Sequence, residues 1–239
     1  MGTIAHTEQE LELERTLREA GARHGDRLVL LCSFQKEESV LVDAVLRYAP
    51  ETRIVTIDTG VLFDETLRTW KAFEDRFGVN VEVFDASNPE SPWSGPEHCC
   101  SVAKVDALER SLQGAEGWIT GIRREQGETR ANTELVEIDA KRGIHKYNPL
   151  ASWTDKDLWK RIADNDLPYN TLHDQGYESI GCAPCTKPGA GREGRWAGTD
   201  KTECGLHDES VLGQEGPPRG LPFEGPEGSR ERPSRTDSP

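Results

Sequence analysis

The sequence predicts an α/β fold, with a parallel sheet covered by helices on both faces, in a single domain that carries a flexible C-terminal segment. Three observations support this prediction. Short apolar runs, LVLLCS at 28–33, RIVTID at 53–58 and VEVFD at 81–85, alternate with segments of helical periodicity. Strands that alternate with helices favour parallel pairing. A chain of 239 residues is long enough to bury one hydrophobic core.

Local signals place the individual elements. A capping box opens a helix over 7–21, and Gly21 is expected to end it. Asp64 and Gly78 mark the two ends of another helix. The remaining predictions are a helix over 37–49, a helix over 99–113, a strand over 117–121, a hairpin of 133–139 with 144–149, and a helix over 154–164.

The formal net charge of −14 limits the possible partners. A broad nucleic-acid or membrane surface needs many Lys and Arg residues, so neither partner is expected. No apolar run is long enough to cross a bilayer and the N-terminus lacks the pattern of a signal peptide, so we expect a cytoplasmic protein. The sequence leaves the oligomeric state open, a homo-oligomer included.

The stretch SFQKEES, residues 33–39, follows the first strand and leads into a helix. A loop in this position directs backbone N–H groups and the helix dipole at an anion. It is not a Walker A loop, because GxxxxGK[ST] is absent. Taken alone, it is equally compatible with an ordinary strand-to-helix turn, and Cys32 with a small core residue.

Cysteines occur in two pairs, Cys99 with Cys100 and Cys182 with Cys185. In the cytosol, cysteines at such spacing are more often metal-binding or catalytic than paired in disulfides. Four thiolates suit either a zinc ion or an iron–sulfur cluster. Because vicinal cysteines fit zinc poorly, the spacing favours a cluster, with zinc and with redox or unligated thiols as alternatives.

An acidic protein that binds an anion needs a local group of basic side chains. The candidates are Lys104, Arg123, Arg124, Arg130, Arg192 and Arg195. Lys104 follows Cys100 by one helical turn, which places it beside the predicted cluster. The alternative for each of these residues is a solvated side chain that balances Asp and Glu.

The segment ECGLH contains a candidate nucleophile, Cys204, with His207 three residues later. A thiol reacts as its thiolate, so a neighbouring cation or metal site would activate it. Taken alone, Cys204 is more simply a spare thiol in a flexible segment. From about residue 211 the chain is rich in Pro, Gly and charge, and we expect a disordered tail.

Five motifs, in this order, resemble the adenylyl-sulfate (APS) reductases of the phosphoadenylyl-sulfate reductase superfamily. They are Cys99 and Cys100 with Lys104, TGIRREQ (120–126), IGCAPCTKP (180–188), REGRWAG (192–198) and ECGLH (203–207). The resemblance holds from about residue 28 to 208. The resemblance implies an adenine nucleotide alpha-hydrolase-like fold. It also implies thioredoxin-dependent reduction of APS to sulfite and AMP, in assimilatory sulfate reduction and cysteine biosynthesis.

The resemblance further implies roles for individual residues. A [4Fe-4S] cluster would be held by Cys99, Cys100, Cys182 and Cys185. Cys204 would attack the sulfur of APS and form an S-sulfocysteine. Substrate binding is implied for Ser33, Phe34, Gln35, Ser39, Asp58, Thr59, Gly60, Lys104, Arg123, Arg124, Arg130, Arg192, Arg195 and His207. Ala103 stands where many relatives carry Arg, so one positive charge beside the cluster is absent.

The domain organisation expected from these motifs has four parts: an N-terminal helix over 1–26, a nucleotide-binding reductase domain with the iron–sulfur site over 27–185, a mobile segment with Cys204 over 186–208, and a disordered tail over 209–239. Three alternative functions remain open at this point. A 3'-phosphoadenylyl-sulfate (PAPS) reductase, or a dual-substrate enzyme, would differ at the ribose 3' position. A tRNA-thiolating enzyme would need a basic surface and an SGGxDS loop. A zinc-structured binding module would contain no iron.

Overall fold

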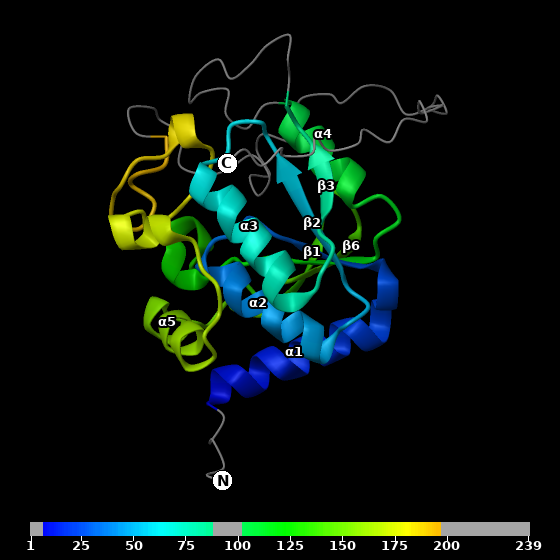
Figure 1. Ribbon diagram of the computed structural model, residues 1–239. Coiled ribbons are helices and arrows are strands. Elements are labelled where there is room, and N and C mark those ends of the chain that lie inside the picture. The colour runs from blue at the N-terminus through cyan, green and yellow to red at the C-terminus, as the bar shows by residue number, and fades with distance from the viewer. Residues whose placement is uncertain (1–6, 88–101, 197–239) are drawn as a thin grey trace.

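A six-stranded sheet with the order β3-β2-β1-β4-β6-β5 forms the centre of the computed structural model, which describes residues 7–87 and 102–196 (Figure 1). The strands are β1 Leu28–Leu31, β2 Arg53–Asp58, β3 Glu82–Asp85, β4 Gly117–Ile119, β5 Val136–Asp139 and β6 Ile144–Tyr147. The α-helices are α1 Glu8–His24, α2 Lys36–Tyr48, α3 Asp64–Phe77, α4 Val102–Ser111 and α5 Asp155–Asp164. Short 3-10 helices are η1 Gly25–Arg27, η3 Arg124–Gln126, η4 Glu128–Arg130, η5 Thr171–Gln175 and η6 Ala183–Cys185.

The strand pairing is parallel except at one edge. β1 pairs with β2 and β4, β2 with β3, and β4 with β6, all in parallel. The connections from β1 to β2 and from β2 to β3 run through α2 and α3, which return the chain to the same end of the sheet. β5 pairs with β6 antiparallel across a tight turn, in which Gly143 has φ 68° and donates its N–H to Asp139 O at 2.7 Å. The predicted parallel sheet and hairpin are confirmed.

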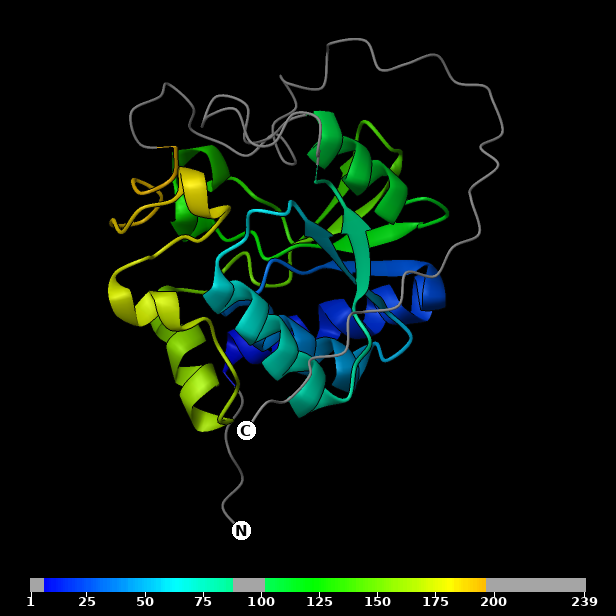
Figure 2. The same cartoon turned by 45° about the horizontal axis from the view of Figure 1, so that its top comes forward.

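Different helices cover the two faces of the sheet (Figures 1 and 2). Successive residues of a strand point to opposite faces. In β1, Leu28 and Leu30 therefore pack in the core formed with α1, α2, α3 and α5, while Val29 packs in the second core, beneath α4. In β4, Ile119 belongs to the first core and Trp118 to the second. The helices on both faces confirm the predicted fold class.

Two predicted element boundaries are wrong for identifiable reasons. Gly21 does not end the first helix, because α1 continues to His24. A Cβ on Gly21 would lie 2.8 Å from the Cβ of Ala49, so this glycine allows α1 to approach the end of α2 closely. The first strand ends at Leu31, before the predicted residue 33, and Phe34 turns the chain toward α2 with φ 59°.

Several expectations concern residues that the structure does not describe. Cys99, Cys100, Cys204 and His207 lie outside the described ranges, as does the predicted tail. Of the predicted mobile segment, residues 186–196 are described, and Trp196 at its end is 1% exposed in the core beneath α4. Among the helices of the described residues, none combines the length and the apolar character that crossing a membrane requires.

Candidate active site

A cavity of about 310 Å³ lies at the carboxyl ends of β1 and β4. The chain leaves β1 toward β2 on one side of the sheet and reaches β4 on the other, so the strand order reverses between them. Ligands of open α/β sheets bind at such a switch point. The described lining holds six Lys or Arg and five Asp or Glu side chains, which makes the cavity far less acidic than the whole chain.

The cavity is lined on one side by the α2 loop, which we define as Ser33–Lys36. Phe34 anchors this loop in the core, because its ring stacks on Trp70 at 5.4 Å and meets Phe73 edge-on at 5.6 Å. With Phe34 only 1% exposed, the positive φ at this residue is held by packing. The loop therefore has a fixed shape before any ligand binds.

Glu38, in the first turn of α2, fastens the same loop. Its Oε2 accepts hydrogen bonds from Ser33 Oγ at 2.9 Å and from the backbone N–H of Gln35 at 3.0 Å. Burial, together with the charge of Glu37, raises the pKa of Glu38 to about 8. Glu38 is therefore mostly protonated at neutral pH, and it shapes the loop without placing a full negative charge beside a bound anion.

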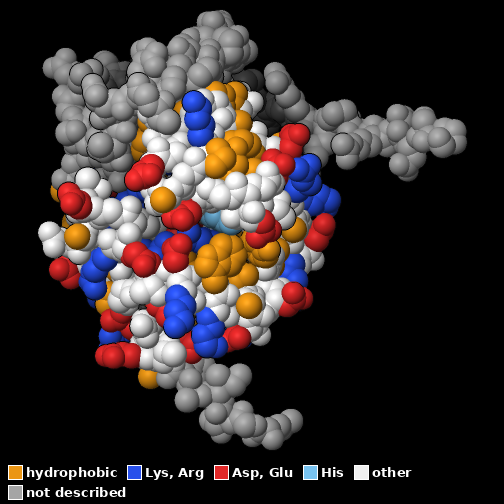
Figure 3. Space-filling model, turned by 90° about the vertical axis from the view of Figure 1, so that its left-hand side faces the viewer, with side chains coloured by type: hydrophobic (Ala, Val, Ile, Leu, Met, Phe, Trp, Pro, Cys, Tyr) orange, Lys and Arg blue, Asp and Glu red, His pale blue; other side chains and the backbone are white. Residues whose placement is uncertain are grey.

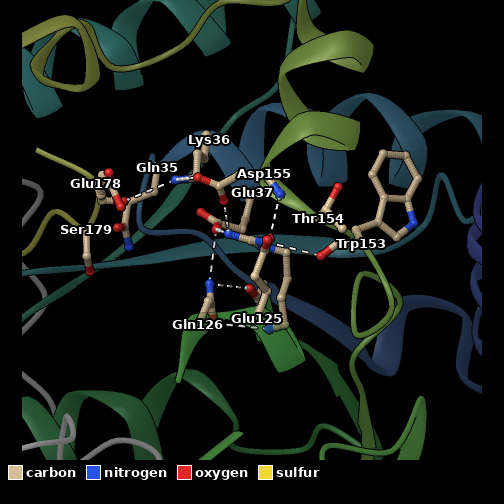
Figure 4. A network of polar contacts seen from close by, with 12 residues as sticks. Gln35, Lys36, Glu37, Glu125, Gln126, Trp153, Thr154, Asp155, Glu178 and Ser179 are labelled. Atoms are coloured by element: carbon tan, nitrogen blue, oxygen red, sulfur yellow. Dashed lines mark hydrogen bonds and ion pairs between the residues drawn. The ribbon is translucent and has the colours of Figure 1, made fainter. Parts of the chain in front are cut away.

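The buried side chain of Arg123 joins several polar partners, of which Glu37, Glu125, Trp153 and Asp155 are labelled in Figure 4. Its guanidinium pairs with Glu37 at 3.0 Å, with Glu125 at 2.9 Å and with Asp155, and it donates to the carbonyl oxygen of Trp153 at 3.2 Å. Burial lowers the pKa of Arg123, but the charges of Glu37 and Asp155 outweigh burial and raise it. Arg123, predicted as a substrate contact, thus uses its donors to fix the cavity wall.

Lys36 joins this network from the start of α2. Its Nζ donates to Asp155 Oδ2 at 2.9 Å and to the carbonyl oxygen of Glu178 at 3.2 Å. Its backbone N–H donates to His173 Nε2 at 3.3 Å, while His173 Nδ1 lies 2.7 Å from the carbonyl oxygen of Tyr177. Burial lowers the pKa of His173, so the ring is neutral, with its proton on Nδ1. One N–H group at the start of α2 is therefore already used within the protein.

Cys182 is the N-cap of η6 and Cys185 is its last residue, and each is 4% exposed. The hydrogen bond with Cys185 lowers the pKa of Cys182 well below its usual value against the effect of burial, and the charges of Lys104 and Arg195 contribute to the lowering. Thr59 Oγ1 lies 3.2 Å from Cys182 Sγ and also stabilises the thiolate. The turn thus presents a buried thiolate beside a second thiol.

Arg195 holds the peptide that precedes Cys182. Its Nη1 donates to the carbonyl oxygen of Ile180 at 3.1 Å, and its guanidinium lies 4.5 Å from the ring centroid of Trp196. A Cβ on Gly181 would lie 2.5 Å from Arg195 Nη2, so glycine makes room for the guanidinium against the backbone. Arg195 is thereby fixed between an aromatic ring and the cysteine segment.

Cys182 and Cys185, the two predicted ligands that the structure describes, fit a metal group that is bound by thiolates. Two buried cysteines share one turn, and the thiolate form of Cys182 is favoured, as a ligand requires. Lys104 acts electrostatically on Cys182, so the first turn of α4 lies within reach of η6, and Cys100 precedes that helix by two residues. Within residues 7–87 and 102–196, no three His, Cys, Asp or Glu side chains form a metal site by themselves.

The structure brings many of the predicted site residues to one cavity. Its lining includes Ser33, Phe34, Gln35, Lys104, Arg123, Arg130, Cys182, Arg192 and Arg195. The described residues that were predicted but do not line it are Ser39, Asp58, Thr59, Gly60, Arg124 and Cys185. Arg124 is exposed and donates to the carbonyl oxygen of Thr133 at 2.9 Å.

The sequence analysis did not name a group of polar residues in the cavity wall as site residues, although most of them lie in the stretches SFQKEES and TGIRREQ. These are Lys36, Glu37, Glu38, Glu125, Gln126, Asp155 and Glu178. Acidic residues in the first turn of a helix are common because they complement the helix dipole, so Glu37 and Glu38 carried no distinctive signal. Asp155, in the first turn of α5, carried no distinctive signal in the sequence for the same reason.

Comparison with known proteins shows which protein family and which individual proteins the chain resembles. Residues 27–188 match the family described as "Phosphoadenosine phosphosulfate reductase domain". The chain is 42% identical over 207 residues to "Adenosine 5'-phosphosulfate reductase" of Bacillus pumilus, with 80% of this chain and 89% of that protein covered. It is 40% identical over 221 residues to "Phosphoadenosine 5'-phosphosulfate reductase" of Gloeobacter violaceus, with 85% and 92% covered.

Solved structures show the same fold. The phosphoadenylyl-sulfate (PAPS) reductase of Candida auris aligns with a TM-score of 0.59 at 22% identity, over 76% of this chain and 98% of that one. The FMN adenylyltransferase of Candida glabrata aligns with a TM-score of 0.59 at 15% identity, over 79% and 68%. These neighbours confirm the adenine nucleotide alpha-hydrolase-like fold. Because the family match covers most of the chain and the two curated relatives are 42% and 40% identical, the chain belongs to the phosphoadenosine phosphosulfate reductase family.

Proposed function

We propose that this protein reduces adenylyl sulfate (APS) to sulfite and AMP, with thioredoxin as the electron donor. The observation that carries the proposal is the cavity at the carboxyl ends of β1 and β4, whose lining joins the α2 loop to Cys182 and to the basic residues Lys104, Arg130, Arg192 and Arg195. Relatives from Bacillus pumilus and Bacillus subtilis, each 42% identical, are named adenosine 5'-phosphosulfate reductases. The reaction would serve sulfate assimilation in the cytoplasm, where thiol donors stay reduced.

The basic residues of the cavity are suited to a phosphosulfate group. Two of them, Arg192 and Arg195, lie over Trp196, with guanidinium carbons 5.4 and 4.5 Å from its ring centroid. A guanidinium group held in this way can offer paired donors to phosphate or sulfate oxygens. On the face shown in Figure 3, acidic and basic side chains are interspersed, which supports a small anion as the ligand in preference to a nucleic acid.

Cys204 is the proposed nucleophile. Its thiolate would donate an electron pair to the sulfur of APS, the bond between that sulfur and the phosphate oxygen would break, and AMP would leave with the bonding pair. A thioredoxin thiolate would then attack Cys204 Sγ and expel sulfite, and a second thioredoxin thiol would resolve the mixed disulfide. Two thiols are thus oxidised to a disulfide while the sulfur of the sulfonyl group gains two electrons. The protein must align two anions and screen their charges.

Cys99, Cys100, Cys182 and Cys185 are the proposed ligands of a [4Fe-4S] cluster. The shared turn of Cys182 and Cys185 and the low pKa of Cys182 support this assignment. When bound, the cluster would supply a structural and electrostatic element next to the substrate, because the electrons of the reaction arrive as thiols. Lys104 and Arg195 would act on both the substrate and the cluster, since they line the cavity and also lower the pKa of Cys182.

The test is a comparison of APS and PAPS as substrates with reduced thioredoxin, with sulfite and the released nucleotide measured together. We expect sulfite from APS with a higher kcat/KM than from PAPS, and none from the Cys204→Ser variant. A protein with a full complement of iron that releases sulfite from neither nucleotide would contradict the proposal.

The second candidate is reduction of PAPS, alone or together with APS. The name of the Gloeobacter violaceus relative favours it, as does the description of the family. PAPS carries an additional phosphate at the ribose 3' position, so its recognition needs a further cation there. A higher kcat/KM for PAPS in the same comparison would establish this function in place of the first.

A further inference from the structure

Gln35 links the α2 loop to the chain segment that leads to the cysteine turn. Its side-chain oxygen accepts a hydrogen bond from the backbone N–H of Ile180 at 2.7 Å. Its side-chain nitrogen donates to Ser33 Oγ at 3.1 Å, within the loop. Ile180 stands two residues before Cys182, so a single side chain connects the wall of the nucleotide cavity with the cysteine turn.

Lys36 makes a second link in the same direction. Its Nζ donates to the carbonyl oxygen of Glu178 while it is paired with Asp155. Figure 4 shows Gln35 and Lys36 directed toward the segment that contains Glu178 and Ser179. With a side chain only 4% exposed, Lys36 holds this link away from bulk water, where a hydrogen bond is stronger.

The segment that contains Glu178 and Ile180 is also held by Arg195. The carbonyl oxygen of Ile180 accepts from Arg195, so the same residue is bonded through its N–H to the α2 loop and through its oxygen to Arg195. α2 is buried from Lys36 to Val45 and cannot follow a movement of the segment. Any displacement of Ile180 that exposes Cys182 must therefore break the bond to Gln35.

We propose that Gln35 and Lys36 are positioning residues that couple nucleotide binding at the α2 loop to the exposure of the Cys182–Cys185 turn. The proposal rests on the proposed function, because it takes AMP or its sulfate ester as the occupant of the cavity. A nucleotide that contacts the loop favours the state in which the bonds to Ile180 and Glu178 are intact. In that state Cys182 is covered, so nucleotide binding protects it. Because such coupling is reciprocal, the protein with a covered Cys182 binds the nucleotide more tightly.

The experiment measures how well AMP protects the cysteine turn in the full-length protein, purified without oxygen. Alkylation of Cys182 by iodoacetamide is followed by peptide mass spectrometry, and iron release to a chelator is followed in the same samples. We expect saturating AMP to slow alkylation by at least about 5-fold, the lower end of typical coupling between sites. In Gln35→Ala and in Lys36→Met, we expect the protection to fall below about 2-fold at AMP concentrations that calorimetry shows to be saturating for each variant, because the lost coupling also weakens AMP binding.

The matched control is Gln175→Ala, which removes the same side chain from an exposed position in η5, close to the segment along the chain. It should keep the protection of the unaltered protein. Equal protection in Gln35→Ala and in the unaltered protein would overturn the coupling. Binding of AMP without protection in the unaltered protein would also overturn it and leave the proposed function intact, whereas failure of AMP to bind would remove both.

Discussion

The backbone of Gly181 lies against the guanidinium of Arg195, so closely that a Cβ on Gly181 would stand 2.5 Å from Nη2 and 2.6 Å from Cζ. All the atoms in this contact belong to the end of a flexible side chain. A larger residue at position 181 would therefore displace the guanidinium from Trp196 and from the carbonyl oxygen of Ile180, without moving the backbone far.

We predict that Gly181→Ala lowers kcat/KM for APS by about 10-fold or more, since each 1.4 kcal/mol of lost stabilisation of the transition state is a factor of 10. The free energy of unfolding should fall by only about 1 kcal/mol, near the lower end for overpacking. Steady-state kinetics and urea denaturation measure the two effects. A large loss of stability with unchanged kinetics would show that the glycine serves packing alone.

Arg123 should be far more important for stability than its neighbour Arg124. Arg123→Met leaves the charge of Glu37 buried without its cation, and removal of one partner of a buried ion pair costs about 3–5 kcal/mol. Asp155 is only partly buried and keeps Lys36 as its partner. Arg124→Met, at an exposed position, should change the free energy of unfolding by less than about 0.5 kcal/mol. Urea denaturation of both variants is the measurement, and equal effects would contradict the buried network.

Glu38 should make stability depend on pH in the opposite direction to an ordinary surface carboxylate. Burial, with the charge of Glu37, raises its pKa from 4.5 to about 8, so the folded protein holds this proton more tightly than the unfolded chain. The contribution is complete below about pH 4.5 and is lost as the pH rises through about 8.

Glu38→Gln removes this titration and keeps an oxygen that accepts from Ser33 and from the Gln35 N–H. We expect the stability of the unaltered protein, relative to the variant, to decrease between about pH 5 and about pH 9, by on the order of 3 kcal/mol. Urea denaturation across this range measures it. A difference that is the same at every pH would show that Glu38 is ionised in the folded state.

The iron content should depend on Cys185 and not on Cys32. Cys185→Ser removes a proposed cluster ligand from η6, so the purified protein should lose most of its iron and sulfide. Cys32→Ala is the matched control, because Cys32 is a buried thiol packed with the β1 residues in the first core. Iron analysis and visible absorbance measure both variants. Equal iron content in the two would contradict the assignment of Cys185 as a ligand.

Much of the fold could be predicted because its signals are local. The capping box of Thr7 with Glu10 was confirmed at the start of α1, and Gly78 ends α3 in the left-handed conformation. The alternation of apolar runs with helices predicted a parallel sheet, and four of the five strand pairs in the described residues are parallel. Gly21 was misplaced because its contact with Ala49 is 28 residues distant in sequence and leaves no local sign.

The candidate site was predictable in its basic residues and less so in its acidic ones. Arg192 and Arg195 belong to the motif REGRWAG, and both line the cavity. The partners of Arg123 lie 86 and 32 residues away, at Glu37 and Asp155, and no periodicity relates them. A motif could name Arg123 as an anion contact, but only the folded structure shows that carboxylates surround it. The strand order, which creates the cavity, was likewise beyond local signals.

The most direct test of the account is the mass of the intact protein after exposure to APS, and separately to PAPS, in the absence of oxygen and of thiols. We predict a sulfonate adduct that forms with APS, is absent from the Cys204→Ser variant, and is discharged by reduced thioredoxin with release of sulfite. An iron-containing protein that acquires no adduct from either nucleotide, or one that acquires it equally after Cys204→Ser, would contradict the proposed covalent mechanism.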